Sequence, residues 1–212
     1  MTTLHLKCPV CETETERDYI NLLNTAKHPE LVRDLQEGKL FEFECDHCGA
    51  KRQLSYQFLY HDPAKHFMVF LLPEYRDDQE QVEQALTDLL TEIDFSLANY
   101  QLRIAVSVPE LIEKVLIFNT GYDDRVVETV KILTDGLFAQ DKPTLPVKAR
   151  YFYLQDNKPK VLYLTDEGQI LADFHEKLVD FVRVKYAKKL DENLKGEFHH
   201  INFKWAFDLL ES

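Results

Sequence analysis

Hydrophobic and polar residues alternate in short runs along the first third of the chain, which predicts β-strands. The runs lie at residues 4–7, 13–20, 40–44, 53–60 and 67–72. The segment His61-Asp62-Pro63-Ala64-Lys65 separates the last two runs. It predicts a hairpin loop, because proline cannot donate a ladder hydrogen bond and aspartate favours turns. Residues 29–35 predict a short helix that ends before Gly38.

From residue 77 the apolar residues recur every three or four positions, which predicts a helix to about residue 95 with Asp77 or Asp78 as its N-cap. Alternation over residues 102–108 then predicts a strand. The segment Ser107-Val108-Pro109-Glu110 is a capping box, in which serine accepts a helix amide and glutamate reaches back to the N-cap, so it predicts the start of another helix. A further helix is expected to begin at Asp123 or Asp124.

Two prolines in the segment 141–146 predict a linker, and we place a domain boundary there. Beyond it, the runs at 147–154 and 160–164 predict a hairpin, and the apolar spacing over 170–194 predicts one long helix. The tail from residue 201 fits both alternation and a helix capped by Asn202, and we favour the helix.

These elements together predict an α+β protein of two domains. The first, residues 1–140, consists of an antiparallel zinc-ribbon-like module at 1–75 and a helical part at 76–140. The second, residues 141–212, consists of a β-hairpin and a long helix.

The charge balance narrows the choice of partners. The chain has 25 Lys and Arg against 37 Asp and Glu, a net charge of −12, which opposes attraction to nucleic-acid phosphates or anionic lipid. No apolar run is long enough for a signal peptide or a membrane span. We therefore expect a cytoplasmic location, where thiols stay reduced.

The cysteines carry the main chemical signal. Cys8-Pro9-Val10-Cys11 and Cys45-Asp46-His47-Cys48 are two C-x-x-C units with 33 residues between them. Two such turns supply the tetrahedral thiolate set that zinc prefers. We expect Cys8, Cys11, Cys45 and Cys48 to hold one zinc ion, with iron and a disulfide or unligated dithiol as the alternatives. Gly49 can take the positive φ of the second turn, whereas Glu12 in its place predicts a less regular first turn.

The segments around these cysteines resemble those of the CpXC domain family, a largely bacterial group regarded as zinc-binding and without an assigned reaction. The resemblance rests on Cys8-Pro9-Val10-Cys11, on the second C-x-x-C after Leu40-Phe41-Glu42-Phe43-Glu44, and on Gly121-Tyr122-Asp123-Asp124-Arg125, and it covers about the first 135 residues. Asp46 stands where the second motif of the family has proline. The resemblance therefore implies a zinc site, with a less rigid second turn.

Other candidate sites have simpler interpretations. His61, Asp62 and His66 could converge on a second metal, but a polar turn explains them. His47 fits an exposed turn residue, and Asp123 and Asp124 fit a helix cap. The chain has no glycine-rich phosphate loop and no H-E-x-x-H or G-x-S-x-G motif. We predict no catalytic residues.

Four thiolates leave no open position on a zinc ion, so the metal is expected to be structural. The sequence therefore favours a protein-interaction or regulatory module with an unknown protein partner. The alternative is a redox-responsive zinc or dithiol switch, because thiolates released from metal can form disulfides.

Overall fold

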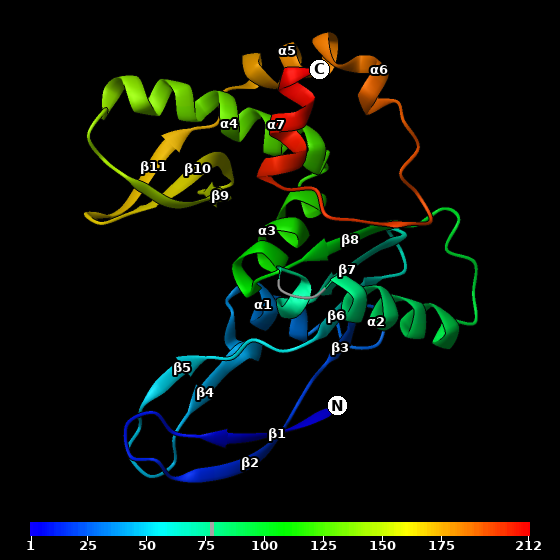
Figure 1. The fold of residues 1–212 in the computed structure, drawn as a ribbon, viewed down its shortest axis with the longest axis vertical. Helices are drawn as coiled ribbons and strands as arrows, with labels where there is room; N and C mark the ends of the chain where they lie inside the picture. The colour runs from blue at the N-terminus through cyan, green and yellow to red at the C-terminus, as the bar shows by residue number, and fades with distance from the viewer. Residues whose placement is uncertain (77–78) are drawn as a thin grey trace. The chain divides into compact units, whose positions relative to one another are not determined.

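The computed structural model describes residues 1–76 and 79–212, which form two compact units. The first unit contains Met1–Ile112 and Lys195–Phe198, and the second contains Glu113–Leu194 and His199–Ser212. Each unit combines helices with antiparallel strands (Figure 1), which confirms the α+β class. The predicted N-caps Asp77 and Asp78 lie outside the described residues.

The N-terminal part of the first unit consists of two antiparallel strand pairs, which we call the ribbon. Strand β1 (Thr2–Lys7) pairs with β2 (Glu14–Tyr19), and β4 (Glu42–Glu44) pairs with β5 (Lys51–Gln53). The predicted runs at 4–7, 13–20 and 40–44 overlap β1, β2 and β4, whereas the predicted run at 53–60 divides between the end of β5 and a later strand. Alternation also explains the packing of the ribbon. Leu6 and Phe43, on the inward faces, are buried, whereas their neighbours His5 and Glu44 are exposed.

A mixed five-stranded sheet forms the rest of the first unit, in the order β12-β8-β7-β6-β3. Its strands are β3 (Leu22–Asn24), β6 (Phe58–Asp62), β7 (Phe67–Leu71), β8 (Gln101–Ala105) and β12 (Phe198–His199). All ten residues of β6 and β7 are buried, as expected for central strands covered on both faces. Strands β3 and β12 have only three and two residues and were not predicted.

Helices cover this sheet. Helix α2 (Gln79–Glu92) packs on one face through Val82 and Leu86, which contact a cluster that includes Met68 and Leu102. Helix α1 (Leu31–Gln36) leads to the 3-10 turn η1 (Lys39–Phe41), whose Phe41 ring lies 5.1 Å from that of Phe58. A second 3-10 turn, η2 (Pro73–Arg76), follows β7. No helix among the described residues is long and apolar enough to cross a membrane.

Helix α3 (Val108–Asn119) begins at the predicted capping box. The Glu110 amide donates to the Ser107 hydroxyl at 3.4 Å, and the Glu110 carboxylate accepts from the Val106 amide at 2.9 Å. The carboxylate therefore reaches one residue further back than the N-cap itself.

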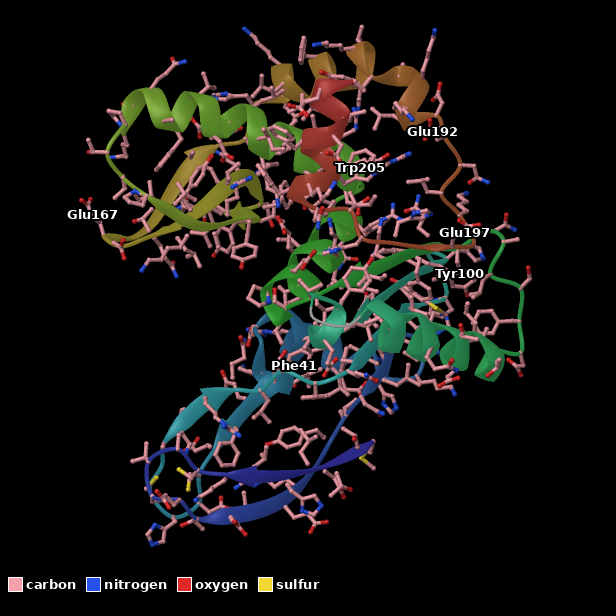
Figure 2. All side chains as sticks on the ribbon, in the orientation of Figure 1. Phe41, Tyr100, Glu167, Glu192, Glu197 and Trp205 are labelled. Carbon is pink, nitrogen blue, oxygen red and sulfur yellow. The ribbon has the colours of Figure 1, made fainter. Side chains whose placement is uncertain are left out.

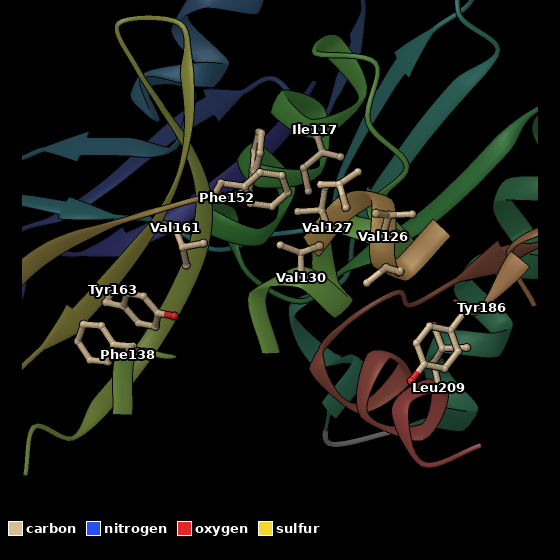
Figure 3. Close-up of a cluster of buried hydrophobic side chains, with 13 residues drawn as sticks. Ile117, Val126, Val127, Val130, Phe138, Phe152, Val161, Tyr163, Tyr186 and Leu209 are labelled. Atoms are coloured by element: carbon tan, nitrogen blue, oxygen red, sulfur yellow. The ribbon is translucent and has the colours of Figure 1, made fainter. Parts of the chain in front are cut away.

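The second unit contains one sheet and four helices besides the end of α3. The sheet has the order β11-β10-β9, from β9 (Val147–Gln155), β10 (Lys158–Thr165) and β11 (Gly168–Asp173). The helices are α4 (Asp124–Asp141), α5 (Glu176–Lys185), α6 (Ala187–Leu190) and α7 (Phe203–Glu211). Helix α4 packs against α5, α7 and β9 around the apolar cluster of Figure 3, where the Phe138 and Tyr163 rings stack at 4.1 Å.

Two expectations for the second unit need correction. Residues 168–173 form a strand, not the start of a long helix, because all six of them pair with β10. The helix begins at Glu176 and is interrupted at Tyr186, before α6. The expected helix α7 is present, with the Asn202 side chain accepting from the Trp205 amide at 3.0 Å.

The predicted boundary after residue 140 does not coincide with the division between the units, because β9 packs on α4 across the proline-rich segment.

A set of five charged side chains is buried inside the second unit, and we call it the buried ion network. Its members are Glu113, Lys114, Asp124, Glu128 and Lys131, none more than 5% exposed. The Lys131 ammonium lies 2.6 Å from Glu113 and 3.0 Å from Glu128, and the Lys114 ammonium lies 3.1 Å from Glu128. The network ties α3 to α4 and, through the Phe152 amide on Glu113, to β9.

Candidate metal centre

The two C-x-x-C turns meet at the end of the ribbon. Figure 2 shows sulfur atoms gathered where the β1–β2 and β4–β5 connections approach each other. The four Sγ atoms all lie within 4.8 Å of one another, and Cys8–Cys48 and Cys11–Cys45 are each separated by 3.6 Å. None of the four cysteines takes part in a disulfide. The structure thus brings together the four cysteines that the sequence singled out.

The two turns have the same backbone. The Glu12 amide donates to the Cys8 carbonyl at 3.0 Å, and the Gly49 amide donates to the Cys45 carbonyl at 2.8 Å. Glu12 and Gly49 both have positive φ, 57° and 69°. The first turn is therefore as regular as the second, contrary to expectation, and Glu12 tolerates a conformation that favours glycine.

The sulfur spacing fits a tetrahedral ion better than a disulfide. Four thiolates at about 2.3 Å from a zinc ion place neighbouring sulfurs about 3.8 Å apart, whereas a disulfide requires about 2.05 Å. The observed 3.6 Å matches the first value. Cys8 and Cys45 are buried, while Cys48 is exposed, so the site lies near the surface. The four cysteines could therefore hold a metal ion.

The thiols ionise unequally. The Thr13 hydroxyl, 3.3 Å from Cys11 Sγ, and the Thr13 amide lower the pKa of Cys11 to about 5. The Cys11 and Val10 amides lower the pKa of Cys8. The Ala50 amide also lowers the pKa of Cys48, but burial and the neighbouring sulfurs outweigh it and raise that pKa to about 12. Sulfurs this close need a cation before all four can become thiolates, which is the condition that metal binding satisfies.

Two arginines surround the centre. Arg17, on β2, forms an ion pair with Asp46 inside the second turn, and this contact raises the pKa of Arg17. The guanidinium carbons of Arg17 and Arg52 each lie 5.4 Å from the centroid of the Phe43 ring. Four thiolates and a divalent ion would carry a net charge of −2, which the Arg17 guanidinium would partly offset, because its charge interacts with Cys45. Asp46, which replaces the proline of the family motif, anchors the turn through this ion pair instead.

Replacement of Arg17 by alanine should therefore weaken metal binding without removing a ligand. We expect the affinity to fall about tenfold, the low end for residues that support metal ligands, because the Asp46 side of the pair is exposed to solvent. Competition with a chromophoric chelator measures the change. Lys7→Ala is the control, since it removes an exposed ion pair with Glu12 in the first turn. Equal affinities of all three proteins would contradict the role of Arg17.

The other candidate metal ligands do not converge. In the described part of the chain, the four cysteines form the one group of three or more cysteine, histidine or acidic side chains with metal-ligand geometry. His61 is buried, with Asn24 Nδ2 3.3 Å from its Nδ1 and the Tyr100 hydroxyl 3.2 Å from its Nε2. His61 therefore has a structural role that joins β3, β6 and the segment before β8.

Burial of His61 predicts a pH dependence of stability. Burial lowers the pKa of His61, and Asp62 offsets part of this effect. The contribution of His61 is therefore complete above about pH 6.5 and is lost as the pH falls through the lowered value. Urea unfolding at pH 7.5 and pH 5.5 should show a smaller difference in the free energy of unfolding for His61→Gln than for the unchanged protein. An equal difference would show that His61 does not contribute.

The simpler interpretations of the remaining candidates are confirmed. His47 is exposed, and Asp123 caps α4 by accepting from the Arg125 amide at 2.9 Å. Asp124, expected only as part of the helix cap, is fully buried, and one of its carboxylate oxygens lies 3.4 Å from the Lys114 ammonium. It therefore belongs to the buried ion network. Sequence reasoning missed Thr13 and Arg17. Arg17 lies on the half-buried face of β2, which the alternation of residues 13–20 could have indicated, whereas Thr13 is exposed before the strand begins and gives no such signal.

The comparisons with known proteins agree with this centre. The CpXC protein family model matches residues 6–131, more than half of the chain, and the match includes all four cysteines. No curated protein matches the chain, and no solved structure matches it. The match ends within α4, so β9 and everything after it lie outside it. With its paired cysteines in place and a match of this length, the chain belongs to the CpXC protein family.

Proposed function

We propose that the chain is a cytoplasmic protein-interaction module whose ribbon is held together by one structural zinc ion. The observation that carries the proposal is the convergence of four cysteine sulfurs at a spacing that suits a tetrahedral ion. Four thiolates fill the coordination sphere of zinc and leave no position for water or substrate. Such an ion stabilises a fold, and the surface of the fold is then available for binding.

The ribbon has little apolar core of its own, which supports a structural role for the ion. Its two strand pairs are each two-stranded, and isolated two-stranded pairs are marginally stable in water. An ion that joins the β1–β2 turn to the β4–β5 turn compensates for that. The acidic charge of −12 fits a partner that is a protein rather than a nucleic acid.

Site-specific photo-crosslinking in the host cell tests the interaction role. A photoreactive amino acid is placed at Val10, 71% exposed on the ribbon, or at Val184, 81% exposed on α5. We expect a discrete protein adduct from at least one position, and the same substitution at buried Val130 is the control that should give none. Absence of a discrete adduct from both exposed positions would contradict the proposed function.

A redox-responsive switch is the second candidate. The observation that favours it is the pairing of sulfurs across the two turns, since loss of the ion would leave Cys8 beside Cys48 and Cys11 beside Cys45. Mild peroxide should then release the ion and form disulfides that dithiothreitol reverses. Retention of the ion until the protein unfolds would exclude the switch and leave the structural role.

A further inference from the structure

One face of α5 and α6 combines lysines with exposed apolar side chains, and we call it the α5 stripe. It consists of Lys177, Phe181, Val184, Lys185 and Lys188. Positions 177, 181, 184 and 188 follow the spacing of one helix face, although the chain is interrupted at Tyr186. The opposite face of α5 carries Val179 and Val182, which are fully buried in the core of the second unit. The stripe is therefore the outward face of a helix whose inward face is already packed.

The apolar residues of the stripe are unusually exposed. Val184 is 81% exposed and Phe181 is 44% exposed. The Lys185 ammonium lies 5.4 Å from the centroid of the Phe181 ring, which keeps a cation beside the apolar surface. Single exposed apolar residues are common, but two of them flanked by lysines on one face form a distinct patch.

The charge of the stripe is opposite to that of the chain. Residues 176–190 contain five basic and two acidic residues, a net charge of +3, in a protein of net charge −12. Lys177 and Lys188 have no ion-pair or hydrogen-bond partner within residues 1–76 and 79–212. Glu176 is engaged with the Tyr122 hydroxyl, so Asp180, at the margin of the stripe, is the one carboxylate near it on α5.

We infer that the α5 stripe binds an acidic amphipathic helix of a partner protein. Leucine-type side chains of such a helix would cover Phe181 and Val184, and its carboxylates would pair with Lys177 and Lys188. The inference rests on the proposed protein-interaction role and names its surface and the chemistry of its partner. The stripe lies outside the residues matched by the family model, which end at residue 131.

A helix fits the stripe better than a membrane or a nucleic acid does. Salt screens electrostatic interactions beyond about 8 Å at physiological ionic strength. A partner helix about 10 Å wide that lies on the stripe is therefore attracted by the lysines of the stripe and is little affected by the acidic groups elsewhere on the chain. An extended anionic surface would also face the acidic remainder of the chain, whose net charge of −12 repels it.

The test uses a fluorescent synthetic peptide of about 18 residues, with leucine at one helix face and glutamate elsewhere. We expect anisotropy to report binding to the full-length protein, and a peptide with lysine in place of glutamate should not bind. Lys188→Glu and Val184→Asp should each weaken binding at least about tenfold. The matched controls Lys158→Glu and Val147→Asp make the same changes at exposed positions on the sheet of the second unit and should leave affinity unchanged.

Several results would overturn the inference. These are no binding of the glutamate peptide, equal binding of the lysine peptide, or equal losses in the control variants. Binding to phosphatidylserine vesicles that Val184→Asp abolishes, without peptide binding, would assign the stripe to membranes instead. A crosslinked adduct at Val10 with none at Val184 would leave the proposed function standing and refute the stripe alone.

Discussion

Cys45→Ser is expected to abolish metal binding and to unfold the ribbon while the second unit stays folded. Cys45 is buried and its sulfur lies 3.6 Å from that of Cys11, and a serine hydroxyl does not supply the thiolate that zinc prefers. Structural zinc contributes about 10–16 kcal/mol of apparent binding free energy in zinc-finger peptides, far more than a two-stranded pair can supply. Amide hydrogen exchange should show loss of protection in β1, β2, β4 and β5.

Val10→Ser is the matched control for this experiment. It changes a 71% exposed side chain between Cys8 and Cys11 and removes no sulfur, so metal content and protection should be retained. The apolar cluster of the second unit has its own buried residues and needs no ion. Full metal content and unchanged protection in Cys45→Ser would refute the assignment of Cys45 as a ligand.

Lys131→Met should destabilise the second unit by about 3–5 kcal/mol, the cost of leaving buried charges without a partner. Burial would lower the pKa of Lys131, but Glu113 and Glu128 outweigh it and raise that pKa. Without the ammonium, Glu113 loses its ion-pair partner, whereas Glu128 keeps Lys114 at 3.1 Å, and burial already raises the pKa of Glu113. Urea unfolding followed by Trp205, the one tryptophan of the chain, measures the loss.

Two variants make this result specific. Lys204→Met removes the cation of an exposed pair with Asp208, for which we expect less than about 1 kcal/mol. The double variant Lys131→Met, Glu113→Gln should recover part of the stability, because glutamine is neutral and still accepts from the Phe152 amide. Equal effects of Lys131→Met and Lys204→Met would show that the network contributes no more than a surface pair.

The cluster of four cysteines was the most predictable part of the molecule, because two C-x-x-C turns specify it locally. Each turn fixes two sulfurs, and the strands read between Cys11 and Cys45 return the chain to the first turn. What the motif could not reveal was its surroundings. Arg17 and Phe43 reach the centre through the pairing of separate strands, and single-sequence alternation does not say which strands meet.

The strand at 168–173 was misread for a different reason. Ile170, Leu171 and Phe174 fit helical spacing and merge with the true helix that starts at Glu176. The tight turn at Gly168, with φ of 116°, instead returns the chain along β10, and pairing there decides the conformation. Short apolar runs of this kind fit both periods, so tertiary pairing determines the outcome.

The buried ion network shows the limit of charge patterns. Asp124, Glu128 and Lys131 occur at spacings of four and three along α4, a pattern that ordinarily indicates a face in water. Here the partners on α3, Glu113 and Lys114, make burial of that face tolerable. The sequence contains all five residues, but only the packing of α3 against α4 identifies them as partners.

The central claim is that four cysteines hold one structural zinc ion, and elemental analysis with a thiol count tests it most directly. The protein is purified anaerobically without added metal or chelator. The account predicts one zinc ion per chain and four thiols that react only after unfolding. A metal-free protein with four reactive or oxidised thiols would contradict it.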